Sequence, residues 1–216
     1  GAIHRALLMV GDISTLTTCY RDKSTYPLFG DSGTVTALEW NPEAPALHFN
    51  LQTDGAGYEA LIIRDGGARH KMSRKSFDIK KIDKGIYRSR LNLELDGIEV
   101  FNFTLREVVP NIKKLLAATG ASLDSIDYVV FHQANRLINE TLRKMLKLDP
   151  ARVPYSIREF GNTSGASVPL TMVVALQETL RTGKCRLLLS AFGVGLSWGT
   201  AIVETDHLCI PDLIEL

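Results

Sequence analysis

The sequence predicts a layered α/β fold in which a mixed sheet is covered by helices. The chain has 216 residues, of which 45% are apolar and 23% charged, as in a globular protein with a large core. Residues 128–204 alternate short apolar runs with amphipathic stretches, which is the pattern of strands separated by helices. Residues 187–203 contain no charged side chain but carry three glycines, which favours two buried strands joined by a turn over a membrane span.

The first ninety residues are predicted to contain three strands and a polar excursion. The apolar run 6–10 is typical of a fully buried parallel strand, and residues 34–40 are rich in side chains that favour strands. Residues 47–51 alternate apolar and polar side chains, as a half-buried strand does. Residues 64–90, rich in Lys, Arg, Asp and Gly, are therefore expected to lie outside the core.

Strands and helices are expected to alternate in the rest of the chain. Residues 91–95 alternate Leu with polar side chains, as a strand does. A helical pattern follows over residues 100–119, in which Pro110 marks a kink or a helix start, and Gly120 is a plausible stop. The remaining expected elements are strands at 128–131, 186–190 and 196–204, and helices at 135–147 and 162–181.

Charge and cysteine content exclude several classes of protein. The 25 Lys and Arg residues nearly balance the 24 Asp and Glu residues, so no overall field favours nucleic acid or an anionic membrane. Cys19, Cys185 and Cys209 form no CxxC pair, which argues against a metal site or a disulfide framework and favours a reducing compartment. Because there is no signal peptide and no initial Met, we expect a cytoplasmic protein whose start lies upstream.

Two polar residues lie where α/β folds gather their ligands. His132 directly follows a predicted buried strand, although a His there could equally serve only to hydrogen-bond a loop. Asn162 precedes a predicted helix, whose N-terminus suits a developing negative charge, although Asn is also an ordinary helix cap. Glycines within 191–199 allow either close approach to a ligand or an ordinary hairpin. Together, a neutral His and an amide could donate hydrogen bonds to one oxyanion.

Three motifs in fixed order resemble those of the type III 3-ketoacyl-acyl-carrier-protein synthases, a branch of the thiolase-like superfamily. The motifs read FHQANRLINETL, FGNTSGASVPL and AFGVGLSWGTAIV. His132 precedes Asn162 by 30 residues, and Asn162 precedes Phe192 by 30 residues, as in that family. The resemblance implies a thiolase-like fold, with residues 1–90 as the end of its N-terminal half and residues 91–216 as its C-terminal domain.

The resemblance also implies a condensing acyltransferase that uses no cofactor and no metal. Such an enzyme moves an acyl group from coenzyme A onto a Cys and condenses it with a malonyl thioester, losing carbon dioxide. By resemblance, His132 and Asn162 stabilise the enolate formed by decarboxylation. The other implied site residues are Phe192, Gly193 and Val194 around the pocket and oxyanion hole, and Phe101 and Asn135 in the pantetheine tunnel.

Departures from the family pattern qualify this interpretation. The family's nucleophilic Cys belongs to an N-terminal half that would precede this chain, so we expect the chain alone to be inactive in condensation, and the intact protein to form a homodimer. Leu137 stands where an Arg often contacts acyl carrier protein. A basic helix face could still bind this acidic carrier, or be merely solvated; its residues are Arg136, Arg143, Lys144 and Lys147.

Three alternatives remain at this point. An acyltransferase of the same fold could make an ester or an amide without decarboxylation, and it would prefer an alcohol or amine acceptor to a malonyl thioester. A thiolase-fold subunit without catalytic activity is disfavoured because both His132 and Asn162 are present. A phosphate-binding helix terminus unrelated to acyl transfer would make the two 30-residue spacings a coincidence.

Overall fold

The computed structural model of the protein describes residues 3–215. Gly1, on which the expectation of an upstream start rests, lies outside the described residues. Among the helices of residues 3–215, none is long and apolar enough to cross a membrane. The uncharged stretch 187–203 instead falls on two antiparallel strands of the main sheet and the turn between them, as the sequence predicts.

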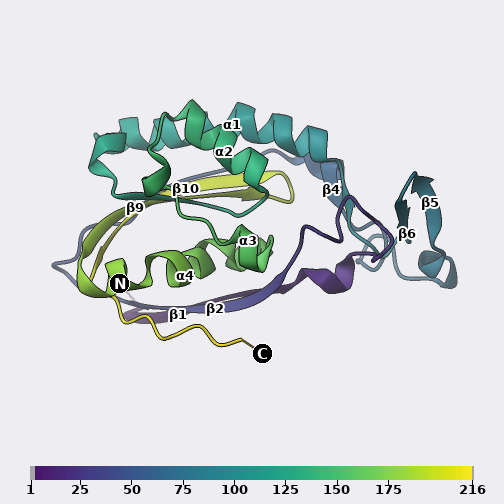
Figure 1. Ribbon diagram of the computed structural model, residues 1–216, viewed down its shortest axis with the longest axis horizontal. Coiled ribbons are helices and arrows are strands. Elements are labelled where there is room, and N and C mark those ends of the chain that lie inside the picture. The colour runs from purple at the N-terminus through teal and green to yellow at the C-terminus, as the bar shows by residue number, and fades with distance from the viewer. Residues whose placement is uncertain (1–2, 216) are drawn as a thin grey trace.

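The chain is built of four stacked layers (Figure 1). The helices α1 (Gly97–Thr119) and α2 (Arg136–Met145) lie above a four-stranded sheet. On the other face of this sheet lies α4 (Ser167–Thr182), which separates it from a lower layer made of β1 (Arg5–Ile13) and β2 (Asp31–Glu39). The expected α/β fold with a mixed sheet covered by helices is confirmed.

The central sheet has the strand order β3-β10-β9-β8. Its strands are β3 (His48–Thr53), β10 (Ser197–Asp206), β9 (Lys184–Gly193) and β8 (Tyr128–Phe131). β8 runs parallel to β9 while the other neighbours are antiparallel, so the sheet is mixed. β3 lies before residue 91 and still completes this sheet; the expected division of the fold at residue 90 stays a prediction.

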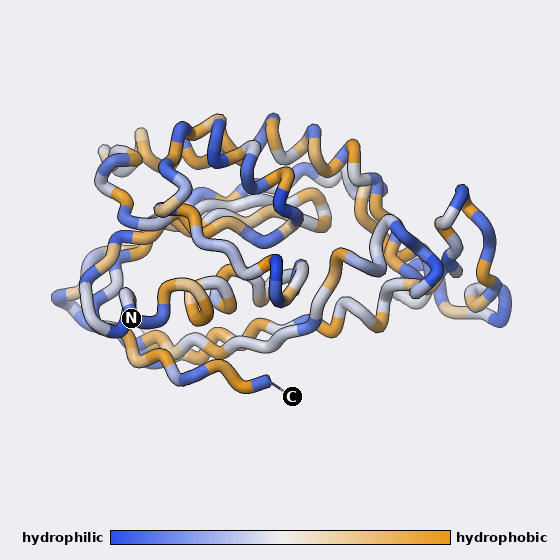
Figure 2. The backbone as a smooth tube through the Cα atoms, in the orientation of Figure 1, coloured by the Kyte–Doolittle hydropathy of each residue, from blue (hydrophilic) through white to orange (hydrophobic). Residues whose placement is uncertain are grey.

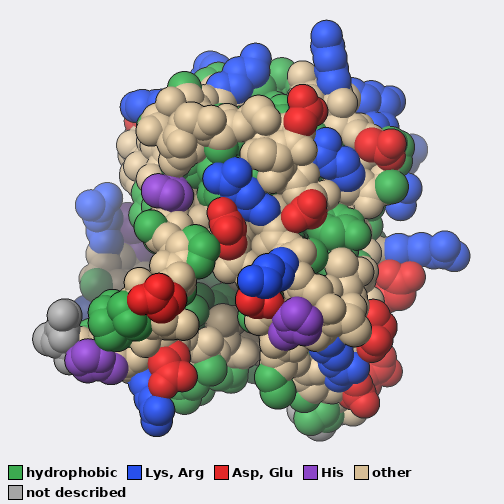
Figure 3. All heavy atoms as spheres, turned by 90° about the vertical axis from the view of Figure 1, so that its left-hand side faces the viewer, with side chains coloured by type: hydrophobic (Ala, Val, Ile, Leu, Met, Phe, Trp, Pro, Cys, Tyr) green, Lys and Arg blue, Asp and Glu red, His purple; other side chains and the backbone are tan. Residues whose placement is uncertain are grey.

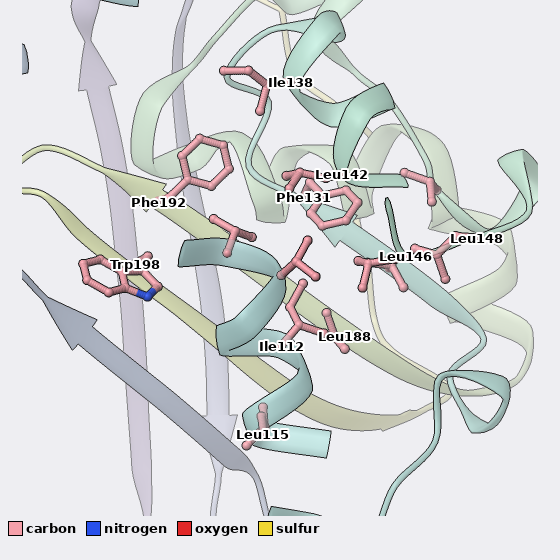
Figure 4. Close-up of a cluster of buried hydrophobic side chains, with 14 of the residues drawn as sticks. Ile112, Leu115, Phe131, Ile138, Leu142, Leu146, Leu148, Leu188, Phe192 and Trp198 are labelled. Carbon is pink, nitrogen blue, oxygen red and sulfur yellow. The ribbon is translucent and has the colours of Figure 1, made fainter. Parts of the chain in front are cut away.

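The main core lies between α1, α2 and the upper face of the sheet (Figure 4). Ile112 of α1 and Leu142 of α2 meet Phe131 and Leu188 of the sheet, and all four are fully buried. Figure 2 shows apolar and polar residues alternating within the turns of α1, as expected of a helix that covers a sheet on one side. This packing fixes β8, which ends one residue before His132.

Local signals at the ends of α1 agree with the sequence. The Asp96 side chain accepts hydrogen bonds from the backbone N–H groups of Ile98 and Glu99 at 3.1 and 3.0 Å, which starts the helix three residues before the predicted range. Gly120 ends it in the left-handed conformation with φ 68°, as predicted. Pro110 lies inside α1 and does not start it.

The half-buried strand predicted over residues 47–51 is observed as β3, and its polar side is the covered one. Leu51 is 75% exposed, and Phe49 is also exposed. The polar side contacts α1 instead: Asn50 Nδ2 donates to the Asn111 backbone oxygen at 2.9 Å, and Asn111 Nδ2 donates to Gln52 Oε1 at 2.7 Å. Paired amides thus replace apolar contacts where the edge strand meets the helix, because each buried polar atom needs a partner.

The predictions for the runs 6–10 and 91–95 are corrected. β1 pairs antiparallel with β2 and is mostly exposed, with Met9 73% accessible, rather than buried and parallel. An apolar run in the sequence predicts a strand, but it does not show which other segment, if any, packs over that strand. In the second run only Glu94–Leu95 form a strand, β7, paired with β4 (Leu61–Ile62), because the Asn92 side chain accepts the Ser89 N–H and forms a turn.

The polar excursion expected at residues 64–90 projects from one end of the molecule (Figure 1). It contains the two-stranded sheet of β5 (Lys80–Asp83) and β6 (Ile86–Arg88). The short helix α3 (Ile157–Phe160) precedes α4. The remaining helical turns are of the 3-10 type: η1 (Ser14–Thr17), η2 (Gly55–Ala60), η3 (Arg74–Phe77), η4 (Leu123–Ser125), η5 (Pro150–Arg152) and η6 (Ser164–Ala166).

Truncation of Leu142 should destabilise the protein strongly, because its side chain is fully enclosed in the core beneath α2. We expect Leu142→Ala to lower the free energy of unfolding by about 2–5 kcal/mol, measured by urea denaturation. Leu137→Ala is the matched control on the same helix, since Leu137 is 67% exposed and its loss should change stability little. Equal losses in the two variants would contradict the packing described above.

Candidate functional site

His132 lies directly beyond the last residue of β8, at the carboxyl end of a parallel strand. Its backbone N–H donates to the Ser190 oxygen of β9 at 2.8 Å, so the backbone hydrogen bonds between β8 and β9 extend to this residue. The imidazole meets the Phe192 ring edge to face, with centroids 5.4 Å apart and planes at 84°. The predicted site residues His132 and Phe192 are therefore neighbours, held by adjacent strands.

The Ser167 hydroxyl contacts the His132 ring on one side. Ser167 Oγ lies 2.6 Å from His132 Nδ1, and it also accepts the Gln133 backbone N–H at 3.3 Å. A hydroxyl oxygen has two lone pairs, so Ser167 can donate its own proton to Nδ1 or accept a second hydrogen bond from it. The imidazole carries its proton on Nε2 when Ser167 is the donor.

Burial keeps the imidazole of His132 neutral. Desolvation lowers the pKa of His132 from 6.5 to about 4, although a hydrogen bond with the Ser164 backbone acts in the opposite direction. Within residues 3–215, no acidic side chain contributes to this shift. The site thus offers a neutral ring near pH 7, which can donate a hydrogen bond without carrying a charge.

Asn162 is fixed through its backbone by the turn LFGDSG. Its N–H donates to the Leu28 oxygen at 2.9 Å, and its carbonyl accepts the Gly30 N–H at 3.0 Å. A Cβ on Gly30 would lie 1.9 Å from the Phe160 oxygen, so this close approach requires glycine. Two segments far apart in the sequence are thereby joined at the site.

The side-chain amide of Asn162 is buried and has a defined orientation. Its Oδ1 accepts the Ser164 backbone N–H at 2.9 Å, while Nδ2 donates to the Ala134 oxygen at 3.4 Å. Since Nδ2 carries two protons, one N–H remains for a ligand. The prediction that this residue caps the long helix is corrected: η6 intervenes, and the N-cap of α4 is Ala166.

Gln133 connects the two halves of this arrangement and was not singled out in the sequence. Its Nε2 donates to the Phe131 oxygen at 2.8 Å, and its Oε1 accepts the N–H groups of Ser156 and Ile157 at 3.2 and 3.3 Å. It therefore ties the end of β8 to the start of α3, which leads into Asn162. Gln133 and Ser167 both lie inside the recognised motifs, which is the only signal that marks them.

The other predicted site residues occupy three different places. Gly193 and Val194 lie at the turn from β9 to β10, with Val194 exposed. Phe101, near the start of α1, is half-buried and packs against the main core. Asn135 caps α2, because its side chain accepts the Ile138 N–H at 2.8 Å. A cavity of about 190 Å³ beside the first turns of α1 includes neither His132 nor Asn162 among its lining residues.

The predicted basic face on α2 is partly occupied by contacts within the chain. Arg143 pairs with Glu140 at 2.9 Å and also donates to a backbone oxygen. The Arg136 guanidinium lies 5.1 Å from the centre of the Tyr155 ring. Lys144 and Lys147 are exposed. Of the four cationic side chains, Arg143 is therefore the one whose charge is paired within the described part of the chain.

The cysteines and acidic groups of the described chain offer no second reactive centre beside His132. Cys185 is the second residue of β9, at the opposite end of that strand from Phe192, and burial raises the pKa of its thiol. Cys19 is buried and Cys209 is exposed near the end of the chain. Across residues 3–215 no group of three or more His, Cys, Asp or Glu side chains could hold a metal ion.

Comparison with known proteins places this geometry in context. Residues 116–205 match the family described as "3-Oxoacyl-[acyl-carrier-protein (ACP)] synthase III C terminal". The beta-ketoacyl-[acyl-carrier-protein] synthase III of Rhodopirellula baltica is 33% identical over 222 aligned residues, covering 92% of this chain and 61% of that protein. The protein of the same name from Streptococcus gordonii is 31% identical over 205 residues, covering 94% of this chain and 60% of the relative.

A solved structure supports the same relationship. The crystal structure of a 3-oxoacyl-(acyl-carrier protein) synthase from Burkholderia xenovorans LB400 superposes with a TM-score of 0.89 at 40% sequence identity. The superposition covers 100% of this chain and 60% of that one. The chain thus spans about 60% of the length of the relatives that it matches.

We expect the His132 ring to titrate far below an ordinary histidine. Imidazole nitrogen chemical shifts, followed by NMR against pH, should show a neutral Nε2–H tautomer that becomes protonated near pH 4. Because the unfolded chain takes up this proton near pH 6.5, the free energy of unfolding should fall as the pH drops from about 6.5 towards 4. Titration of the folded protein near 6.5 would contradict the burial of the ring.

Proposed function

Since the chain belongs to the 3-oxoacyl-[acyl-carrier-protein] synthase III family, whose C-terminal domain it contains, we propose that it supplies the decarboxylating part of a condensing active site. The thiolase-like fold expected from the motifs is the fold observed. The observation that carries the proposal is that a neutral His132 and a buried Asn162 both contact the Ser164 backbone, and that the Asn162 amide keeps one N–H available.

The proposed step is the decarboxylation of a malonyl thioester. His132 Nε2–H and Asn162 Nδ2–H donate to the carbonyl oxygen of the thioester. The bond between the carboxylate and the neighbouring carbon breaks, its electron pair forms the enolate, and carbon dioxide leaves. Negative charge develops on the oxygen held by the two donors, and each such donor is worth about 10²–10³ in rate.

The low pKa of His132 suits this charge-stabilising role. A neutral donor needs no proton transfer during the step, so the ring can hold the enolate oxygen throughout the pH range in which the substrate carboxylate is ionised. Phe192, which packs edge to face on the imidazole, shields the enolate from water in this proposal. The enolate carbon then attacks the carbonyl carbon of the acyl group on the nucleophilic Cys, the carbon–sulfur bond breaks, and the Cys leaves as a thiolate.

We further propose that the nucleophilic Cys lies in a segment preceding this chain. The coverage of about 60% of the relatives' length leaves room for it, and none of Cys19, Cys185 and Cys209 lies in an activating environment beside His132. The chain alone would then be inactive in condensation. Backbone N–H groups around Gly193 and Val194 would hold the acyl oxyanion, and Phe101 and Asn135 would line the pantetheine tunnel.

Of the partners in this proposal, acyl carrier protein is the one that the relatives' names print, and the others follow from the resemblance of the motifs. Acyl-coenzyme A provides the acyl group, acyl carrier protein delivers the malonyl thioester, and no further cofactor takes part. The intact protein would act as a cytoplasmic homodimer in the synthesis of fatty acids or related polyketides. An acyltransferase that makes esters or amides is the alternative, and preference for an alcohol or amine acceptor over a malonyl thioester would establish it.

His132→Ala, made in the protein extended to its natural start, should separate the two partial reactions. We expect malonyl-coenzyme A decarboxylation to fall by about 10²–10³, because one of the two oxyanion donors is lost, while acylation of the upstream Cys continues. Release of carbon dioxide and intact-protein mass measure the two steps. His207→Ala is the control, since this histidine is 62% exposed and paired with Asp206 at the far end of β10.

Equal loss of both partial reactions in His132→Ala would count against the proposal. In that case His132 would act mainly in folding or in activating the thiol, and not in stabilising an enolate.

A further inference from the structure

The excursion from the body of the molecule carries a concentrated positive charge. Residues 69–84, named here the basic finger, contain seven Lys or Arg residues and two Asp residues, although the whole chain has a net charge of only +1. The finger projects at the right-hand end of Figure 1, where η3 and β5 lie. At the opposite end of the molecule, seen in Figure 3, positive and negative side chains are mixed. The charge is therefore unevenly distributed.

The cationic side chains of the basic finger are free to meet a partner. They are exposed, and within residues 3–215 none of the seven forms an ion pair; they are Arg69, Lys71, Arg74, Lys75, Lys80, Lys81 and Lys84. The arginines at the base of the finger differ, because Arg64, Arg88 and Arg90 each pair with a carboxylate. Ion pairs thus neutralise the arginines of the stem, whereas the positive charges of the finger stay unpaired.

Hydrogen bonds fix the stem to the body of the protein. The fully buried Asp22 pairs with Arg88 at 3.3 Å, and the Lys23 N–H donates to the Gly85 oxygen at 3.0 Å. The Asp65 carboxylate accepts two bonds from Arg90, at 2.9 and 2.8 Å, and one from the Ser76 hydroxyl at 2.7 Å. Because the stem is held in this way, its backbone loses little conformational entropy when a partner binds the finger.

Apolar side chains lie exposed among these charges. Phe77 is 61% accessible, and Met72, Ile79 and Ile82 are exposed as well. A small anion would satisfy the lysines but leave these apolar groups in water. A second copy of the finger would cover them, but it would bring two strongly positive surfaces together. The combination fits an acidic protein surface that also presents apolar side chains.

We propose that the basic finger is the docking surface for the acidic acyl carrier protein, an inference that rests on the proposed function. The finger stem leads through β7 into the first turn of α1, and Phe101 of the expected tunnel lies in the next turn. A carrier held there lies at the same end of the molecule as that turn. On α2, by contrast, Arg143 is paired with Glu140, and Leu137 stands where the family often has Arg.

Charge reversal of a lysine pair on the finger tests this docking surface. In the protein extended to its natural start, Lys80→Glu with Lys81→Glu should weaken binding of malonyl-loaded carrier protein about tenfold or more, measured by titration calorimetry at low salt. Added salt should lower the affinity of the unsubstituted protein for the carrier towards that of the variant. The matched control is Lys113→Glu with Lys114→Glu, an exposed adjacent pair on α1, which should bind as the unsubstituted protein does.

Several outcomes would overturn the docking proposal. Unchanged carrier affinity in the finger variant, at an unchanged unfolding temperature, would overturn it. A larger loss of affinity for Lys144→Glu with Lys147→Glu, at and just beyond the end of α2, would overturn it as well. Loss of binding only to vesicles of anionic lipid would assign the finger to a membrane, and loss of self-association in sedimentation would assign it to a second copy. Malonyl-coenzyme A decarboxylation by the unsubstituted protein tests the proposed function separately, because this small thioester needs no docking surface.

Discussion

The hydrogen bonds of Gln133 at the end of β8 are the constraint on which the site depends. A buried strand that ends inside a protein leaves backbone groups that must find partners, and an unpaired buried amide costs about 1–3 kcal/mol. Gln133 is fully buried, and its side chain satisfies the Phe131 oxygen and the first N–H groups of the segment that carries α3. His132 and Asn162 are therefore oriented by one frame, and the catalytic proposal depends on that shared frame.

The sequence predicted the central sheet and its helices because their apolar patterns are long and local. β8, β9, β10 and α1 lie where those patterns fall. It failed at β1, which is exposed and antiparallel, and at β3 it predicted the strand without showing that the polar side is the covered one. The run of alternating leucines before α1 failed because the Asn92 side chain competes with strand pairing.

The sequence predicted those site residues whose type and place beside a strand or helix indicate a chemical role. His132 and Asn162 were found because they lie next to a strand and a turn in motifs with fixed spacing. Ser167 and Gln133 were not, because their roles arise only from partners brought together by folding. The balanced overall charge likewise hid the basic finger, whose importance depends on which charges are paired and which are free.

The division of labour between this chain and an upstream nucleophile is the central claim, and intact-protein mass tests it most directly. This chain and a version extended to its natural start would each be incubated with acyl-coenzyme A. The account predicts an acyl adduct on the extended protein alone. An adduct on this chain would mean that Cys19, Cys185 or Cys209 is a reactive nucleophile, and it would contradict the roles assigned to the two parts of the protein.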